Sequence, residues 1–290
     1  MTIEHYENFP VASWLCSPRL RPAVAAIYHF ARTADDIADE GRASCAERVA
    51  QLDDYGQALQ RAANGKTEGP WQHVFAPLAA AIERHQLPLD PLIDLLSAFT
   101  QDAGNPSYPD RAALLHYCAR SANPVGRLML HLMGLTGREA AAESDAVCTA
   151  LQLINFWQDL SIDLPRGRVY VPVADAARMG LDAQQLRAGT DSDASQALVR
   201  SLVDWARQAM RAGAPLVHRV PGRMGWELRF VIQGGLLVLD KIEAGGCNAL
   251  SSRPTITRAD GPRLVWRAIR MRPLAAVATR LPLPGDGHAQ

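Results

Sequence analysis

Apolar residues recur along this chain at the spacing of an amphipathic α-helix, and few stretches alternate as a β-strand does. Prolines and glycines such as Pro70, Pro109, Pro165 and Gly222 fall between the helical stretches. We therefore expect an all-α protein. Its predicted helices lie near residues 19–40, 44–63, 70–85, 90–102, 110–136, 138–163, 193–219, 223–246 and 258–279.

The pattern gives no sign of a linker that would divide the chain. We expect one helical domain over residues 1–280 and a disordered tail over 281–290. Residues 164–192 are predicted to form a long loop with short turns, and long ordered loops are often functional. The N-terminus lacks a basic region followed by an apolar core, and no uncharged apolar run approaches the ~20 residues that span a bilayer.

Composition narrows the functional classes. The chain has 30 basic and 30 acidic residues, which argues against a general nucleic-acid binder. Its five cysteines form no Cys-x-x-Cys pair, so neither a zinc site nor a disulfide framework is indicated. A reducing cytoplasm is the expected compartment.

The first predicted helix is apolar around most of its circumference but carries a line of charged residues. At about 100° per residue, Tyr28, Arg32, Asp35 and Asp39 fall on one stripe, with Asp36 at its edge. A helix that is apolar nearly all round is an interior helix, so we expect the acids to face a cavity rather than bulk water. Because one arginine cannot neutralise three aspartates, Mg²⁺ is the natural partner. The alternative is a solvated acidic face with an Arg–Asp pair.

A second stripe follows in "VCTALQLINFWQDLSID". On a helix, Gln152, Asn155, Asp159 and Asp163 share one side, and no charge occurs from residue 147 to residue 158. If the two stripes face each other, they form an acid-lined cavity that holds several Mg²⁺ ions. A diphosphate would bridge these ions, and they would assist its departure.

An apolar compartment is expected beside this cavity. Rings such as those of Phe9, Tyr28 and Phe156 could hold an isoprenoid chain and stabilise a carbocation. Core packing is the alternative for each ring, and it is the one we favour for Phe30 and Trp157.

These motifs resemble those of the squalene and phytoene synthases. "YHFARTADDIADE" is similar to their Tyr-x-x-x-Arg-x-x-Asp-Asp-x-x-Asp segment, and "QLINFWQDLSIDLPRGRVYVP" is similar to their second segment with its Gly-Arg-x-Tyr-x-Pro tail. The resemblance implies a single-domain isoprenoid-synthase fold of the class I terpenoid-synthase type with a central cavity, and Mg²⁺-dependent chemistry on prenyl diphosphates. It implies that about three Mg²⁺ ions bind with the diphosphate to Asp35, Asp36, Asp39, Asp159 and Asp163. The residues that it places around the diphosphate and the cation are Tyr28, Arg32, Gln152, Asn155, Arg168 and Tyr170.

A narrower likeness concerns one branch of that family. "ENFPVAS", "YCARSANPVGRL" and "RGRVYVP" resemble the hydroxysqualene synthases of bacterial hopanoid pathways. These ionise presqualene diphosphate, rearrange the cation and capture it with water. The resemblance implies functional partners: a presqualene diphosphate synthase upstream and a flavin-dependent reductase downstream.

Two alternatives stay open at this point. One is head-to-head condensation of two prenyl diphosphates to presqualene diphosphate or phytoene. The other is a non-catalytic helical assembly factor, which should lose the aspartates that this chain keeps. We expect no NADPH, because no Gly-x-Gly-x-x-Gly opens a strand–helix unit, and this favours capture by water over capture by hydride.

Some positions depart from the broader family. Where phytoene synthases have small residues, this chain has Asn123 and Pro124, and a kink there, with Tyr117, is predicted to position the quenching water; a plain packing kink is the alternative. Gly235 stands where related synthases can carry a tyrosine, and Arg253 is all that remains of a run of arginines that contacts diphosphate. Phe9 and Ser13 are the candidates for contacts with the substrate near the N-terminus.

The last predicted helix is basic. Arg263, Arg267 and Arg270 share a face, with Trp266 and Ile269 nearby. A helix that lies at a membrane surface has this pattern, but so does a solvated basic face on a terminal helix, which is the interpretation that we favour from sequence. Peripheral contact with the inner membrane is therefore a hypothesis.

Overall fold

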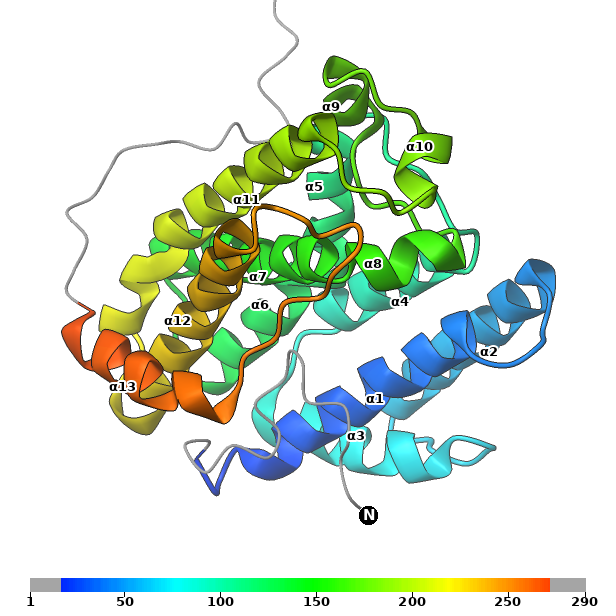
Figure 1. The fold of residues 1–290 in the computed structure, drawn as a ribbon. Helices are drawn as coiled ribbons and strands as arrows, with labels where there is room; N and C mark the ends of the chain where they lie inside the picture. The colour runs from blue at the N-terminus through cyan, green and yellow to red at the C-terminus, as the bar shows by residue number, and fades with distance from the viewer. Residues whose placement is uncertain (1–16, 272–290) are drawn as a thin grey trace, which may run out of the picture.

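The computed structural model describes residues 17–271, and within that range the chain forms helices and no β-strand (Figure 1). The all-α prediction is confirmed. The α-helices are α1 (Arg21–Asp39), α2 (Cys45–Ala63), α3 (Gln72–His85), α4 (Asp90–Asp102), α5 (Arg111–Ser121), α6 (Asn123–Leu132), α7 (Arg138–Gln158), α8 (Leu160–Asp163), α9 (Val173–Arg178), α10 (Ala183–Arg187), α11 (Asp193–Gly213), α12 (Gly222–Ala244) and α13 (Gly261–Arg270). The 3-10 helices are η1 (Leu164–Arg166), η2 (Ala214–His218) and η3 (Arg258–Asp260).

Two of the predicted long helices are broken. The helix expected over 110–136 is α5 and α6, because Pro124 has no N–H to continue the α5 hydrogen bonds. The kink predicted at Pro124 is therefore present. The helix expected over 138–163 breaks at Asp159, where φ is −100° and ψ is 12°. As a result, Asp159 ends α7 and Asp163 ends the short helix α8.

The remaining predicted segments differ less from the observed ones. The loop predicted over 164–192 contains η1, α9 and α10, so its turns are short helices. The helix predicted over 258–279 is α-helical from Gly261 to Arg270, and its remainder lies outside the described residues, as does the predicted tail. The division into one domain over 1–280 and a tail stays a prediction.

The hydrophobic side chains form two main clusters. One lies among α1 to α4 and contains the packed rings of Phe30, Tyr55 and Phe75, with the Tyr55 hydroxyl donating to the Phe30 carbonyl at 3.1 Å. The other surrounds α7 and includes Trp157 and Trp205. Phe30 and Trp157 are both fully buried, as expected for core residues. Figure 1 shows α7 at the centre, with α11 and α12 on one side and α1 to α3 on the other.

Close packing of α7 against α11 depends on Gly213. A Cβ atom at this position would lie 2.5 Å from the Glu143 carbonyl oxygen and 2.7 Å from the Val147 amide nitrogen, and backbone atoms inside a helix cannot move aside. We expect Gly213→Ala to lower the free energy of unfolding by about 2–3 kcal/mol, as measured by urea denaturation. Gly261→Ala is the matched control, because a Cβ there meets nothing within 4 Å. Equal losses in the two variants would contradict this packing.

Within residues 17–271, the helices are too short or too polar to cross a lipid bilayer.

Candidate active site

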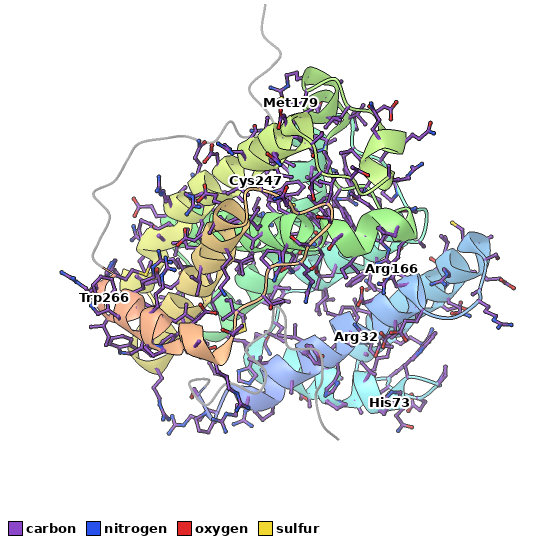
Figure 2. The ribbon with its side chains drawn as sticks, viewed as in Figure 1. Arg32, His73, Arg166, Met179, Cys247 and Trp266 are labelled. Carbon is purple, nitrogen blue, oxygen red and sulfur yellow. The ribbon has the colours of Figure 1, made fainter. Side chains whose placement is uncertain are left out.

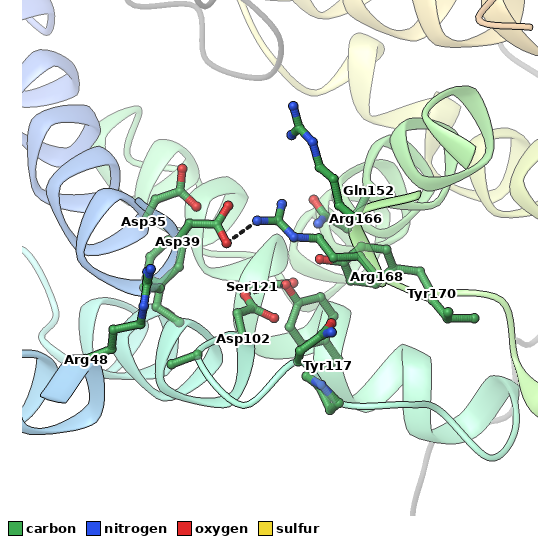
Figure 3. Close-up of a pocket in the computed structure, with 16 residues that line it drawn as sticks. Asp35, Asp39, Arg48, Asp102, Tyr117, Ser121, Gln152, Arg166, Arg168 and Tyr170 are labelled. Atoms are coloured by element: carbon green, nitrogen blue, oxygen red, sulfur yellow. Dashed lines mark hydrogen bonds and ion pairs between the residues drawn. The ribbon is translucent and has the colours of Figure 1, made fainter. Parts of the chain in front are cut away.

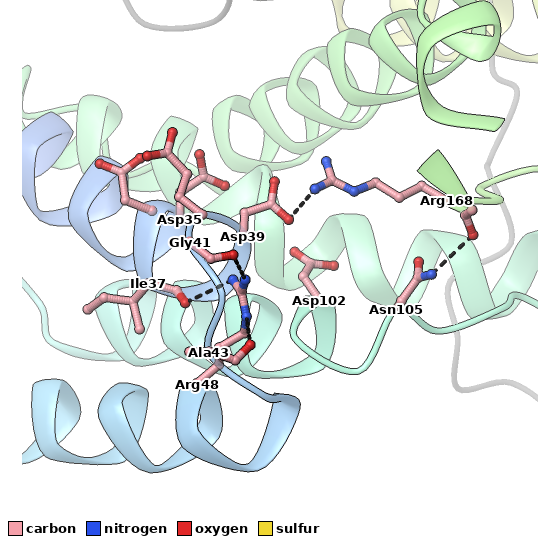
Figure 4. A network of polar contacts seen from close by, with 12 residues as sticks. Asp35, Ile37, Asp39, Gly41, Ala43, Arg48, Asp102, Asn105 and Arg168 are labelled. Atoms are coloured by element: carbon pink, nitrogen blue, oxygen red, sulfur yellow. Dashed lines mark hydrogen bonds and ion pairs between the residues drawn. The ribbon is translucent and has the colours of Figure 1, made fainter. Parts of the chain in front are cut away.

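The end of α1 is held in place by one arginine of α2. Arg48 donates hydrogen bonds to three backbone carbonyls, those of Ala43 at 3.0 Å, Gly41 at 3.1 Å and Ile37 at 3.3 Å (Figure 4). Gly41 has a φ of 81°, a left-handed conformation that glycine adopts without strain. This tight turn fixes the last helical turn of α1, which carries Asp39.

The charged stripe of α1 divides between a cavity and an ion-pair cluster. Arg32 pairs with Asp35 at 3.0 Å, with Asp36 at 2.5 Å and with Glu40 at 2.9 Å. The side chains of Asp35, Asp36 and Asp39 are 43%, 40% and 35% exposed. The prediction that all three acids avoid bulk water is therefore wrong. The cavity is open, and the Arg–Asp pair of the alternative interpretation is also formed.

Asp35 and Asp39 line a cavity of about 460 Å³ between the two hydrophobic clusters (Figure 3). Its wall is mainly polar, which suits a diphosphate better than a hydrocarbon chain. The full lining is Asp35, Ala38, Asp39, Arg48, Phe99, Asp102, Ala103, Asn105, Pro106, Tyr117, Ser121, Gln152, Arg166, Arg168, Val169 and Tyr170.

The second stripe reaches this cavity only in part. Gln152 lines it, whereas Asn155, Asp159 and Asp163 do not. Asp159 forms an ion pair with Arg253, which comes from the segment between α12 and η3. A hydrogen bond of 2.7 Å from the Gln158 side chain to the carbonyl of Pro254 anchors that segment. The structure thus places Arg253 on a carboxylate, and its predicted contact with diphosphate stays a prediction.

Arg168 connects the two acidic segments. It forms an ion pair with Asp39 of α1 (Figures 3 and 4). Its charge also lowers the pKa of Asp163, while the charge of Asp39 raises it, so the three groups share one electrostatic environment. The loop that carries Arg168 is held by a hydrogen bond from the side chain of Asn105 to the Gly167 carbonyl at 3.0 Å. The two acidic segments therefore lie near the same side of the molecule rather than facing apart.

Burial raises the pKa of carboxyl groups in both segments. Loss of hydration is the largest cause for Asp35, whose pKa rises to about 6, and for Asp163, whose pKa also rises to about 6. Neighbouring aspartates raise both pKa values further. Arg32 and Arg168 lower the pKa of Asp35, and Arg168 and Arg166 lower that of Asp163. Asp35 keeps some contact with solvent because the cavity is open, but protein surrounds it on the other sides. Acids held in this way gain from a bound cation.

Within the described range, no three His, Cys, Asp or Glu side chains converge closely enough to hold a metal ion by themselves. Arginines stand beside the acids instead: Arg32 beside Asp35, Arg168 beside Asp39 and Arg253 beside Asp159. The donor set, carboxylates with raised pKa values, still fits Mg²⁺ shared with the oxygens of a phosphorylated ligand.

Sequence reasoning missed Asp102, which lies at the end of α4 and lines the cavity. The Tyr117 hydroxyl donates a hydrogen bond of 2.8 Å to its Oδ2, and its buried Oδ1 has no hydrogen-bond partner within residues 17–271. Burial raises the pKa of Asp102 to about 7, and the charges of Asp35 and Asp39 contribute. No motif marked it, because Asp102 reaches the cavity through the packing of α4 against α1 and α5.

The aromatic wall is made by rings from α5, α7 and the segment after η1. The Tyr170 ring stacks on that of Phe156 with centroids 3.8 Å apart, and the Tyr117 ring lies 6.3 Å from each. Burial raises the pKa of both tyrosines well above their ordinary value, so both hydroxyls stay protonated. Tyr117 and Tyr170, predicted from sequence, are thus brought together at the cavity.

Other predicted residues lie apart from the cavity. Tyr28 does not line it and makes an edge contact with His29, and Arg32 points to its ion-pair cluster. Asn123 is buried beside α7, where its side-chain oxygen accepts a hydrogen bond of 2.9 Å from Thr149. Its role in positioning water stays a prediction.

Two further predictions concern the N-terminal segment and a glycine of α12. Phe9 and Ser13 lie outside the described residues. At Gly235, a Cβ atom would be 3.0 Å from side-chain atoms of Ile154 and Met210, so α12 packs tightly on α7 where related synthases can carry a tyrosine.

The isolated carboxyl of Asp102 makes stability depend on pH. Because its folded pKa lies above the ordinary 3.8, the folded protein holds this proton more tightly than the unfolded chain, and stability falls as pH rises from about 4 to about 7. In Asp102→Asn the amide keeps an oxygen for Tyr117 and does not ionise. Relative to the original chain, we expect the variant to gain about 2 kcal/mol in unfolding free energy between pH 5 and pH 8. Urea denaturation without Mg²⁺ measures it.

Asp53→Asn, on the exposed face of α2, is the control for that experiment and should show no such gain. A constant difference between Asp102→Asn and the original chain across this pH range would contradict the raised pKa.

Comparisons with known proteins agree with this geometry. A family model described as squalene/phytoene synthase matches residues 3–260. The chain is 35% identical to the hydroxysqualene synthase of Sinorhizobium fredii over 81% of this chain and 78% of that protein. It is 30% identical to the phytoene synthase of Thermus thermophilus over 98% of this chain and 92% of that protein.

Solved structures give the same result. The crystal structure of squalene synthase HpnC from Alicyclobacillus acidocaldarius matches with a TM-score of 0.77 and 37% identity, over 84% of this chain and 90% of that one. A dehydrosqualene synthase in complex with ligand matches with a TM-score of 0.73 at 21% identity, over 87% of this chain and 85% of that one, and shows the shared fold.

Proposed function

Because this chain belongs to the squalene/phytoene synthase family, we propose that it converts presqualene diphosphate and water to hydroxysqualene and diphosphate in a reaction that depends on Mg²⁺. One observation carries the proposal: Asp35, Asp39 and Arg168 line a polar cavity whose wall also contains Tyr117 and Tyr170. Hydroxysqualene synthases from Sinorhizobium fredii and Rhodopseudomonas palustris, each 35% identical to this chain, support this substrate over others of the family.

The acids would hold the metal. Mg²⁺, when bound, neutralises the charge that develops on the departing diphosphate. Asp35 and Asp163 are favoured as ligands by their raised pKa values, and Asp39 by its place in the cavity wall beside Asp35. Asp36 and Asp159 are the remaining proposed ligands, each now paired with an arginine.

The arginines would hold the diphosphate. Arg166 and Arg168 line the cavity, and the planar guanidinium group can donate two hydrogen bonds to one phosphate group. Arg32 and Arg253 now contact carboxylates and would supply further donors. Gln152 lines the wall beside them, and Asn155 is one helical turn further along α7.

The aromatic wall would stabilise the cation, and Asp102 would accept the proton that the water loses. The faces of Tyr117 and Tyr170 can stabilise positive charge after the carbon–oxygen bond to diphosphate breaks. Water then forms the new carbon–oxygen bond and loses one proton. Asp102 can accept that proton at Oδ1, because this atom is unpartnered within the described residues and the pKa of the group is about 7.

Two other functions are not favoured. Head-to-head condensation of prenyl diphosphates would use the same acids. An assembly factor would have no use for them. The test is to supply purified protein with presqualene diphosphate and farnesyl diphosphate separately, each with Mg²⁺. We expect hydroxysqualene and diphosphate from the first and no product from the second. Turnover of farnesyl diphosphate alone would overturn the proposal in favour of condensation.

The proposal extends to partners and place. A presqualene diphosphate synthase would supply the substrate, and a flavin-dependent reductase would consume the product. Both molecules carry a long hydrocarbon chain, so a cytoplasmic protein in peripheral contact with the inner membrane is the arrangement that we propose. NADPH has no role in this reaction, because water rather than hydride captures the cation.

A further inference from the structure

The last described helix, α13, turns Arg267 inward and leaves three large apolar side chains exposed. Its buried side packs on α12 through Ala268, which is fully buried, and through Arg267. Its outer side presents Val265, Trp266 and Ile269, whose exposed fractions are 45%, 58% and 63%. Figure 2 shows Trp266 on the outside of α13. Trp266 and Ile269 are the most exposed large apolar residues in the described part of the chain. A helix on the surface of a protein in water normally turns its large apolar side chains toward the core.

An acidic residue of α12 explains why the helix docks this way round. Asp240 accepts from Arg267 at 2.6 Å, from Arg263 at 3.2 Å and from Arg207 of α11 at 2.9 Å. Lys241 pairs with Asp260 at 2.8 Å and fixes the start of the same helix. Two arginines of the basic face predicted from sequence are therefore paired with Asp240: Arg267, whose side chain is 24% exposed, and Arg263, whose side chain is 54% exposed.

The apolar face continues onto α12. The Arg229 side chain donates to the Met271 carbonyl at 2.7 Å, which ties the end of α13 to the first turns of α12. Trp226, 45% exposed, lies in those turns, with the Arg229 guanidinium carbon 5.3 Å from its ring centroid. Arg270 stands in the same way 4.7 Å from the ring of Trp266. Exposed tryptophans paired with arginines suit the boundary between lipid tails and head groups.

The positive charge on and beside α13 favours a negatively charged surface as its partner. Arg263 and Arg267 are paired with Asp240, whereas Arg270 and Arg229 stand beside the two exposed tryptophans, and the sequence has no acidic residue between Asp260 and Asp286. A second copy of the chain would bring like charges together at this face, whereas an anionic bilayer would attract them. The surface formed by Val265, Trp266, Ile269 and Trp226 thus has the chemistry of a contact with anionic lipid.

We propose that this surface, the α13 face, docks the protein on an anionic membrane, with Trp266 and Ile269 entering the head-group region. The α13 face lies outside the residues proposed for the reaction. The inference rests on the proposed function only for its reason, because a substrate and a product with long hydrocarbon chains would pass between the bilayer and the protein.

Flotation of the full chain with vesicles, without substrate, tests this proposal. We expect binding to phosphatidylcholine vesicles that contain phosphatidylglycerol, weaker binding to phosphatidylcholine alone, and loss of binding at high salt. Replacing both Trp266→Glu and Ile269→Glu should lower the bound fraction about tenfold. Ile93→Glu, at a position 41% exposed on α4, is the matched control and should bind as the original chain does.

A second measurement covers the case in which the double variant folds poorly. Lipids with brominated tails should quench the tryptophan fluorescence of the original chain, and the milder Trp266→Phe should remove most of that quenching. The proposal is overturned if the original chain does not bind anionic vesicles. It is also overturned if both variants bind the vesicles, and are quenched by the brominated lipids, to the same extent as the original chain. It is also overturned if sedimentation shows a dimer that the double variant dissociates while vesicles bind neither form. Turnover in detergent by the double variant should be unchanged, so the reaction is judged separately.

Discussion

Asp35→Asn will reduce turnover of presqualene diphosphate by about a thousandfold or more, without a loss of stability. Asp35 lines the cavity, and burial raises its pKa to about 6, so an ionised carboxylate at this position destabilises the folded protein. An amide of the same shape removes the negative charge that a metal needs. Release of diphosphate, measured at saturating Mg²⁺ and pH 8, reports the loss.

The direction of the pH effect adds a second check. With a folded pKa above the ordinary 3.8, Asp35 is protonated at pH 5 and ionised at pH 8, so activity should rise through about pH 6. Asp54→Asn, on the exposed side of α2, is the control and should leave turnover within twofold. If Asp35→Asn kept a tenth or more of the original rate, Asp35 would not be a metal ligand.

Arg168→Gln is expected to lower kcat/KM for presqualene diphosphate by about a hundredfold. Arg168 forms an ion pair with Asp39 and influences Asp163, so it sits where a diphosphate must meet both acidic segments. The variant should also bind inorganic pyrophosphate with Mg²⁺ more weakly, which calorimetry can measure without any reaction.

Arg168→Lys sharpens that test, because lysine keeps the charge but cannot donate two parallel hydrogen bonds. We expect it to recover part of the lost activity. Arg61→Gln, on the exposed end of α2, should behave as the original chain. Unchanged pyrophosphate affinity in Arg168→Gln would mean that Arg168 only neutralises Asp39.

Helical spacing in the sequence was enough to predict an all-α chain and the acidic stripe of α1, whereas the isoprenoid-synthase fold was implied by the resemblance of the motifs. The stripe of Asp35 and Asp39 follows from a period of 3.6 residues, and both side chains line the cavity. The break at Asp159 could not be predicted this way, because it depends on how the segment after α7 turns toward α4. The same turn leaves Asp163 close to the charges of Asp39 and Arg168.

Residues that reach the site through tertiary packing left no local signal. Asp102 is the last residue of α4, which carries no motif, yet it lines the cavity. Arg48 belongs to α2, which also carries no motif, yet it holds the turn after α1. The docking of α13 is a similar case: its composition indicated an amphipathic helix, but only the ion pairs with Asp240 decide which face is outward.

The most direct test of the account is the reaction of the full chain with presqualene diphosphate in water enriched in oxygen-18. With Mg²⁺ present, mass spectrometry should find hydroxysqualene carrying the heavy oxygen, in equal amount to the diphosphate released. With the metal chelated, neither product should form. Hydroxysqualene without the label, or label incorporation that does not depend on Mg²⁺, would contradict metal-assisted ionisation followed by capture of the cation by water.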